Sequence, residues 1–444
     1  MDKRRITIIV GVLLGVLVLL IIAMVVLGGR QQSAEDEGDA GPVTIRYWRV
    51  FDDKDKFQPL IDRYQADHPD VKIEYRKLTY EEYERTLVDA LAGGRGPDIF
   101  TVHNTWLPRY FDKIEPISAE KYALRDYRNE FYPPALETVR NDRIYGIPLA
   151  IDSLGLYLNA EFEGGTGTHE APKTWEDLVG EPGNPDRPGL LRELNQRQGD
   201  RFVRSAIALG NNTVNRSVDI LALMMLQQRT QMTNDDNTQA TFNLTQDVEG
   251  RQQPLGRLAL EFYTSFADPR SSNYSWNSKS GDSVRAFAEG KVAYMLGYAY
   301  HAPELERLNP ELQYEIAPMP QIAGTSPVNY ASFWVETVAQ GSEHPKEAWN
   351  FLRFITNRDQ MREYTQAVES VPARKEVPAS GGLDVLQEQL ETARSWYKGD
   401  AAKADAIFAR MIDQVLAGEN PQNVIDRGAN ELTDILRQLN ASTQ

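Results

Sequence analysis

The chain has 444 residues, of which 41% are hydrophobic and 25% are charged, as in an ordinary globular protein that is too long for one compact core. Its net charge of −16 argues against a nucleic-acid partner and against a basic patch that binds a membrane surface. The absence of cysteine excludes disulfides, thiolate metal sites, cysteine nucleophiles and a lipid-modified N-terminal cysteine.

The first part of the chain predicts a membrane anchor. Basic residues at positions 3–5 precede an uncharged apolar run from Ile6 to Leu27. At ~1.5 Å per residue this run spans about 33 Å, enough to cross the ~30 Å hydrocarbon core as a helix. Residues 1–5 would then stay in the cytoplasm and the rest would be exported. A cleaved signal peptide is the alternative, although residues 26–28 form only a weak cleavage site.

Residues 28–42 have no apolar pattern and carry several acidic side chains, which indicates an acidic flexible linker. Strand and helix patterns then alternate with short connections, which favours a parallel sheet. In such sheets ligands bind beyond the carboxyl ends of the strands, here residues 48–53 and 103–110. The expected elements are a strand over 43–49, a helix over 57–64, a strand over 71–75, a helix over 80–91 and a strand over 98–102.

The segment 144–159 predicts a crossing between two lobes. It contains two apolar runs that are interrupted by one acid, Asp152, and Pro148 removes a backbone donor just before that acid. Burying an unpaired carboxylate is costly, so we expect a polar group held at a hinge. The elements expected after the crossing are a helix over 218–226, a helix, glycine turn and strand over 283–296, strands over 314–320 and 332–338, a helix from His344, and helices around 402–417 and 421–439.

The order of these motifs resembles family 1 of the extracytoplasmic solute-binding proteins of ABC importers, which bind mostly sugars and include maltose-binding protein. The resemblance runs from about residue 43 to the C-terminus. Relatives from cells without an outer membrane usually carry a lipidated cysteine, and the apolar run would replace it as the anchor. The motifs that carry the resemblance are HPDVKIEY (68–75), GGRGPDIFTV (93–102), IYGIPLAIDSLGLYLN (144–159), PKTWEDL (172–178), AFAEGKVAYMLGYAY (286–300), YEIAPMPQ (314–321), HPKEAWNFLRFIT (344–356) and SVPARKEV (370–377).

The resemblance implies an α/β fold of the type II periplasmic-binding-protein kind, with two α/β lobes, a hinge and a central cleft. Lobe 1 would comprise residues 43–150 and 335–375, and lobe 2 residues 151–334 and 376–444. A small polar solute, most often a sugar, would bind in the cleft, and the closed protein would deliver it to the permease of an ABC importer. The resemblance implies no cofactor, no metal and no catalysis.

Aromatic and polar side chains near the expected strand ends are the candidate ligand contacts. Aromatic rings suit the apolar faces of a sugar, and carboxylates and amides suit its hydroxyls. The resemblance places a sugar-binding acid at Asp152, ligand contacts at Asn104 and Trp106, and aromatic platforms at Tyr298 and Tyr300. The full set of candidates is Trp48, Phe51, Asp53, Asn104, Trp106, Asp152, Asn211, Tyr298, Tyr300, Trp334 and Arg374.

Several of these residues also allow a purely structural interpretation. Trp48 could pack under its loop, Asp53 could belong with Asp52 to a solvated acidic turn, Asp152 could make only a hinge hydrogen bond, and Asn211 could cap a loop. We expect Trp175 and Trp349 to belong to the core, and Trp276 is an aromatic without an assigned place.

The sequence argues against an enzyme and leaves a sensor role open. A glycosidase needs two carboxylates about 5–10 Å apart, and Asp53, Asp152 and Glu336 show no spacing that supports one. The five histidines form no metal-binding pattern. A binding lobe that reports to a membrane sensor instead of a permease would use the same cleft, and it stays open as an alternative.

Overall fold

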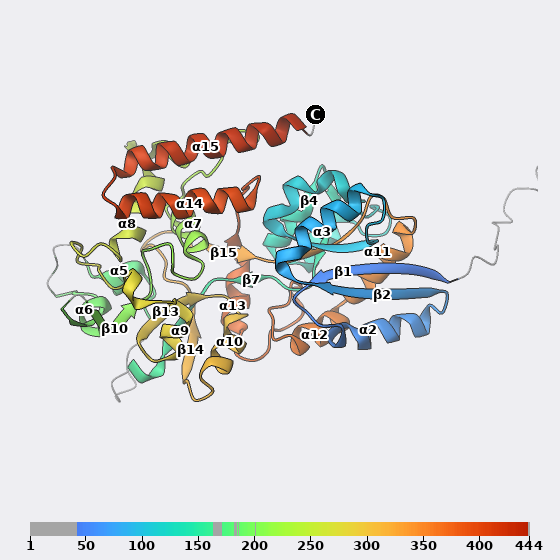
Figure 1. Ribbon diagram of the computed structural model, residues 1–444, viewed down its shortest axis with the longest axis horizontal. Coiled ribbons are helices and arrows are strands. Elements are labelled where there is room, and N and C mark those ends of the chain that lie inside the picture. The colour runs from blue at the N-terminus through green and yellow to red at the C-terminus, as the bar shows by residue number, and fades with distance from the viewer. Residues whose placement is uncertain (1–41, 163–170, 182–183, 185, 200, 443–444) are drawn as a thin grey trace, which may run out of the picture.

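The computed structural model describes residues 42–162, 171–181, 184, 186–199 and 201–442. The predicted membrane helix over 6–27 and nearly all of the predicted linker over 28–42 lie outside these residues. Within the described ranges, no helix is both long enough and apolar enough to span a bilayer. The structure places two lobes side by side, with the strands that cross between them in the middle (Figure 1).

The first lobe is built on a mixed sheet of five strands in the order β2-β1-β3-β16-β6. The first three strands are parallel, which confirms the prediction for residues 43–103, whereas β16 runs antiparallel to both of its neighbours, β3 and β6. The elements of this lobe are β1 (Val43–Val50), α2 (Lys54–Asp67), β2 (Val71–Leu78), α3 (Tyr80–Ala92), β3 (Ile99–His103), α4 (Leu124–Glu130), β4 (Val139–Arg140), β5 (Arg143–Ile144), β6 (Ile147–Pro148), β16 (Trp334–Val338), α11 (Pro345–Ile355) and α12 (Arg358–Ala367).

The second lobe is built on another sheet of five strands, in the order β14-β8-β13-β10-β9. The predicted helices near residues 218–226, 402–417 and 421–439 are all present. The elements of this lobe are β8 (Gly155–Asn159), α5 (Trp175–Val179), α6 (Leu190–Leu194), β9 (Gln196–Gln198), β10 (Arg201–Ile207), α7 (Ser217–Gln227), β11 (Gln246–Val248), β12 (Arg251–Gln253), α8 (Leu255–Ser265), α9 (Ser283–Ala288), β13 (Val292–Gly297), α10 (His301–Leu308), β14 (Tyr314–Ala317), α14 (Ala401–Leu416) and α15 (Pro421–Ser442).

A small sheet joins the lobes. It has three strands in the order β17-β15-β7, formed by β17 (Ala393–Arg394), β15 (Asn329–Ser332) and β7 (Asp152–Ser153), and α13 (Asp384–Glu388) lies beside it (Figure 1). Ser332 pairs with Asp152 in this sheet, so the acid that interrupts the apolar run does lie where the chain crosses. Three strand crossings at one place form a pivot about which the lobes can move.

Each lobe has its own cluster of buried apolar side chains. Trp175 and Trp349 are buried, as predicted, and each indole nitrogen donates a hydrogen bond, to Gln227 Oε1 and to the backbone oxygen of Glu115 respectively. Trp276 is also buried, in the core of the second lobe. Residues around 383–401 pack on the first core after the last crossing, so the exact lobe boundaries stay a prediction.

Candidate ligand-binding cleft

A cavity of about 780 Å³ lies between the lobes. Its walls come from the carboxyl ends of β1 and β3, from the crossing strands, and from the segments around residues 216–219, 300 and 398–405 in the second lobe. The two predicted strand ends thus meet at the cavity, as expected for a sheet whose parallel strands end at one edge. A volume of this size lies in the range of ~300–1,000 Å³ that is usual for small-molecule sites.

The first lobe contributes an aromatic wall, formed by Phe51, Tyr80, Trp106 and Trp334. The ring of Phe51 stacks on Tyr80 with centroids 5.9 Å apart, and Trp334 meets Trp106 edge-on at 5.1 Å. Phe51 and Tyr80 are each 53% exposed, and Tyr300 on the opposite wall is 43% exposed. Large rings that stay half open to water around one cavity mark a binding surface.

The backbone of Phe51 is in the left-handed region, with φ 70°. A bulky residue in this region stores strain that the surrounding structure must offset. The strained position lies immediately after β1 and turns the chain so that the ring reaches the cavity. Strain of this kind gathers at ligand-binding sites.

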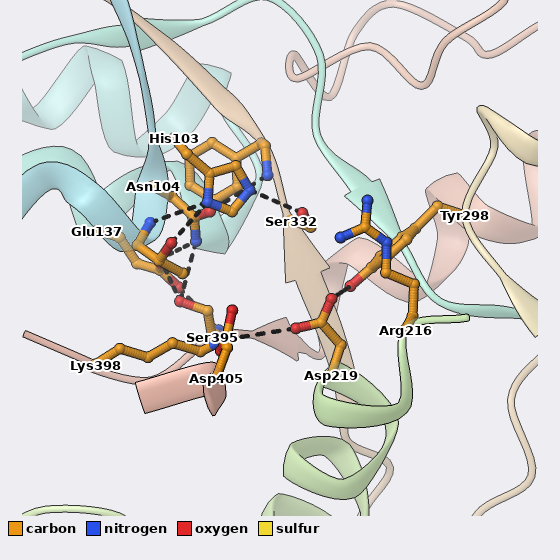
Figure 2. A network of polar contacts seen from close by, with 12 residues as sticks. His103, Asn104, Glu137, Arg216, Asp219, Tyr298, Ser332, Ser395, Lys398 and Asp405 are labelled. Carbon is orange, nitrogen blue, oxygen red and sulfur yellow. Dashed lines mark hydrogen bonds and ion pairs between the residues drawn. The ribbon is translucent and has the colours of Figure 1, made fainter. Parts of the chain in front are cut away.

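The wall of the second lobe is polar. Lys398 is buried, and its Nζ lies 2.7 Å from Asp405 Oδ1 and 3.5 Å from Asp219 Oδ1, while the hydroxyl of Tyr298 donates to Asp219 (Figure 2). Burial alone would lower the pKa of Lys398, but Tyr330, Asp405 and Asp219 outweigh burial and raise it. The lysine is therefore charged and compensated by its two carboxylates.

Asp152 lies at the base of the cavity, on the crossing strand. Its Oδ1 atom is buried and accepts no hydrogen bond within the described part of the chain. Burial raises the pKa of Asp152 to about 7, although the backbone amides of Ala299, Ser153 and Tyr300 offset part of the effect. An acceptor without a partner in a cavity is available to a ligand hydroxyl.

His103 lies beside the aromatic wall as a neutral side chain. Burial lowers the pKa of His103 to about 3. One ring nitrogen lies 2.7 Å from Thr105 Oγ1 and the other 3.0 Å from Ser332 Oγ. The histidine thus links β3 to the crossing strand β15 and stays uncharged at neutral pH.

The raised pKa of Asp152 predicts a pH-dependent affinity. If a ligand hydroxyl donates to the carboxylate, binding requires its ionised form, and Kd should rise about tenfold between pH 8 and pH 6. His103 does not titrate in this range because its pKa is about 3. Isothermal titration calorimetry at several pH values, in buffers of different ionisation enthalpy, would measure the affinity and the proton released on binding.

The stability of the folded protein changes with pH in the opposite direction to its affinity for the ligand. The pKa of Asp152 in the folded protein lies above its value of ~3.9 in an unfolded chain. The stability that the protonated form contributes is complete below about pH 4 and is lost as the pH rises through about 7. A pH-independent affinity from pH 6 to pH 8 would contradict the contact between Asp152 and the ligand.

Six of the predicted residues lie at the cavity or directly behind it. Phe51, Trp106, Asp152, Tyr300 and Trp334 line it. Tyr298 is fully buried behind Tyr300, with ring centroids 5.7 Å apart, and supports the polar wall through Asp219. Their contact with a ligand stays a prediction.

The other five predicted residues do not line the cavity. Trp48 is buried and packs beneath the guanidinium of Arg76, whose Cζ lies 4.9 Å from the ring centroid. Asp53 lies outside, at the start of α2, and pairs with Lys77 at 2.9 Å. Its neighbour Asp52 lines the cavity instead.

Asn104, Asn211 and Arg374 are used by the fold. Asn104 donates to Glu137 and to Ser395 (Figure 2). The side-chain oxygen of Asn211 accepts from the backbone amides of residues 213 and 214, which is a loop cap. Arg374 pairs with Glu130 at 3.0 Å and with Glu376 at 2.8 Å. None of the three lines the cavity.

Sequence reasoning missed most of the charged lining residues, among them Arg49, Arg216, Asp219, Lys398 and Asp405. Nothing in their local pattern distinguishes them from solvated charges. Tyr80 could have been found, because it follows β2 and the carboxyl end of β2 lies at the same edge as those of β1 and β3. Tyr80 also fits the apolar face of the helix expected over 80–91, so the sequence pattern did not indicate that it lines the cavity.

The three carboxylates considered for hydrolysis do not come together at the cavity. Of Asp53, Asp152 and Glu336, only Asp152 lines the cavity, and Glu336 is fully buried. Within the ranges that the structure describes, no group of three or more histidine or acidic residues could hold a metal ion. The arrangement can bind and orient a solute between an apolar and a polar wall.

Removal of one of the two most exposed rings of the cavity should weaken binding without harming the fold. We expect Phe51→Ala to raise Kd about tenfold, because one stacked ring contributes about 1–1.5 kcal/mol to the binding free energy. The left-handed backbone at this position stays strained in part, because alanine also disfavours that conformation. Leu244→Ala is the matched control, since Leu244 is 47% exposed and lies outside the cavity. Fluorescence titration and thermal unfolding would measure the two effects, and equal affinities for both variants would contradict a stacking role.

Two α/β lobes, a set of crossing strands and a lined cavity between the lobes are the architecture of a solute-binding protein. The family model of the bacterial extracellular solute-binding proteins matches residues 59–389. The chain belongs to this family, which confirms the resemblance seen in its motifs.

Individual relatives are distant in sequence. A putative binding protein of Brucella abortus is 20% identical over 324 residues, which cover 72% of this chain and 73% of that protein. The maltotriose-binding protein of Pyrococcus abyssi is 28% identical over 149 residues, or 33% of this chain and 31% of that protein.

Solved structures share the fold. The cyclic alpha-maltosyl-1,6-maltose binding protein of Arthrobacter globiformis superposes with a TM-score of 0.71 at 18% identity, covering 90% of this chain and 100% of that one. The sugar-binding protein MalE of Xanthomonas citri has the same TM-score at 17% identity, with 89% and 98% covered. The periplasmic-binding-protein-like fold is therefore established.

Proposed function

We propose that this protein is a membrane-anchored, extracytoplasmic receptor that captures a sugar or oligosaccharide and delivers it to the permease of an ABC importer. The observation that carries the proposal is the cavity with an aromatic wall on one lobe and a polar wall on the other. A saccharide has apolar C–H faces and a rim of hydroxyls, so it complements both walls at once.

The relatives support the choice of ligand. Several solved structures with this fold carry maltose, maltotriose or other saccharides according to their descriptions. The half-exposed rings Phe51, Tyr80 and Tyr300 leave apolar surface that a bound saccharide would cover. Burial of that surface supplies the driving force for closure of the two lobes about the crossing strands.

We assign the anchor to residues 6–27, which precede the described part of the chain. The basic residues before the run keep the N-terminus in the cytoplasm and place the lobes outside. The extracellular location of the family agrees with this orientation. The acidic linker over 28–42 then gives the lobes freedom to reach the permease.

The test is thermal unfolding of the full chain in detergent micelles with monosaccharides, oligosaccharides, polyols, amino acids and peptides. A ligand present at 100 times its Kd adds ~2.7 kcal/mol to the free energy of unfolding, which gives a measurable rise in melting temperature. We expect a rise with one class of saccharide. A rise with peptides or amino acids alone would overturn the choice of ligand while the binding role stands.

A further inference from the structure

Arg216 stands in the cavity with a backbone conformation that disfavours it. It is the residue before α7, in the N-cap position, with φ 61° in the left-handed region and no capping hydrogen bond from its side chain. Glycine or asparagine takes this conformation at lower cost, and asparagine also caps helices well. Phe51 on the opposite wall is strained in the same way, so each wall of the cavity holds one such residue.

The guanidinium of Arg216 lies over the rings of Tyr298 and Tyr300, with 5.7 and 5.3 Å to the two centroids. Its Nε atom donates to the hydroxyl of Tyr300. Within the described residues, its two Nη groups donate to no protein atom and no carboxylate lies within ion-pair distance. The rings of Tyr298 and Tyr300 hold the planar fork in one orientation, and Figure 2 shows Arg216 beside Tyr298.

The other two cationic side chains of the cavity are already compensated. Arg49 lies 3.2 Å from Glu336 and 3.3 Å from Asp52. Lys398 lies between Asp219 and Asp405. Within the described lining, Arg216 is thus the cation that no carboxylate compensates at ion-pair distance.

An acceptor without a partner faces the same cavity. Asp152 Oδ1 accepts no hydrogen bond within the described residues. The positive charge of Arg216 favours the ionised form of Asp152 and opposes the rise of its pKa by burial. A pair of neighbouring hydroxyls on a sugar ring offers acceptors for a guanidinium fork and a donor for a carboxylate.

We propose that Arg216 is a specificity-determining residue of the cleft, whose two Nη groups donate to neighbouring oxygen atoms of an uncharged saccharide. The proposal rests on the saccharide-binding function proposed above and names the class of saccharide. A smaller residue would relax the backbone at position 216, and a strained residue of this kind is typical of a ligand contact.

The charges of the lining select against acidic sugars. Carboxylates outnumber cations in the cavity, and an added carboxylate or phosphate on the ligand would be repelled. The acidic side chains are Asp52, Glu81, Glu84, Asp152, Asp219 and Asp405, and the basic ones are Arg49, Arg216 and Lys398.

The experiment is calorimetric titration of the full chain in detergent micelles. The neutral probes are maltose, maltotriose, cellobiose and D-tagatose, and the acidic probes are D-glucuronate and glucose 6-phosphate. We expect at least one neutral probe and neither acidic probe to bind the wild-type protein. Arg216→Met and Arg216→Lys should each raise the Kd of that neutral probe at least about tenfold, because charged hydrogen bonds are lost or the fork is absent.

A second variant separates binding from folding. Arg216→Asn should keep or raise the melting temperature, since asparagine tolerates the left-handed conformation and can cap α7, while Kd rises as in Arg216→Met. Arg229→Asn is the matched control, because Arg229 has φ 62° at the other end of α7 and lies outside the cavity. Its Kd should equal that of the wild type.

The outcomes distinguish the two proposals. Wild-type affinity in Arg216→Met, or an acidic probe that binds more tightly than every neutral one, would overturn the role of Arg216 while saccharide binding stands. Failure of all the saccharides on the wild-type protein would overturn the proposed function and the role of Arg216 with it.

Discussion

Asp152→Asn should weaken saccharide binding about a hundredfold and make the unliganded protein more stable at pH 8 than the wild type. The carboxylate accepts from a ligand hydroxyl, and loss of a charged hydrogen bond costs about 1.5–3 kcal/mol of binding free energy. Burial of the same carboxylate is only partly compensated, as its pKa of about 7 shows, so a neutral amide removes a cost of folding. Calorimetric titration and thermal unfolding measure the two effects on one sample.

The stability gain should disappear at low pH. Below about pH 4 Asp152 is protonated in both the folded and the unfolded chain, and the variant then has no advantage. Asp98→Asn is the matched control, because Asp98 is buried but accepts from the backbone of Arg46 at 2.8 Å and from Ser342 at 2.7 Å. It should lose stability and keep its affinity. An Asp152→Asn variant that binds as tightly as the wild type would remove Asp152 from the site.

Glu336→Ala should destabilise the first lobe by about 3 kcal/mol, because it leaves a guanidinium buried with one partner fewer. Glu336 is fully buried on β16, where it accepts from the hydroxyl of Tyr47 at 2.6 Å and lies 3.2 Å from Arg49. Arg49 itself is buried and stacks over the ring of Phe57, with 4.5 Å to the centroid. Arg49 keeps its ion pair with Asp52 at 3.3 Å, so the loss of stability should lie near the lower end of the ~3–5 kcal/mol that breaking a buried ion pair costs.

Thermal unfolding would show a melting temperature lower by roughly 6–12 °C if the lobe unfolds as a unit of this size. Glu363→Ala is the control, since Glu363 pairs with Arg63 on the surface and should cost well under ~1 kcal/mol. The double variant Arg49→Met with Glu336→Gln should lose less stability than the sum of the single changes, because the uncompensated charge is gone. Additive losses would show that the two side chains do not act as a pair.

The local pattern of the chain was sufficient for the first sheet. The apolar stripe Phe57, Leu60, Ile61 and Tyr64 predicts α2, and it ends at His68 because the following proline disfavours a further helical residue. Alternating apolar residues predict β1 and β2, and their order predicts the parallel pairing. Both patterns depend on neighbours within a few residues, so they can be recognised in the sequence without a tertiary structure.

The cleft was predictable in part for the same reason. The carboxyl ends of parallel strands lie at one edge, so Phe51 and Trp106 could be placed near a ligand from their positions after β1 and β3. The rule places a chain segment and not the direction of a side chain. Trp48 and Asn104 lie in the same segments as Phe51 and Trp106 but face the protein interior.

The sequence by itself determined that the chain has an apolar N-terminal run, alternating strands and helices, and a crossing segment with one acid in it. The tertiary structure alone decided which charges share the cavity, because Arg216 and Asp219 meet Lys398 and Asp405 from two segments that are far apart along the chain. A charge that is solvated and a charge that lines a cleft have the same local pattern. Only the packing of distant segments sets their burial, their partners and their pKa values.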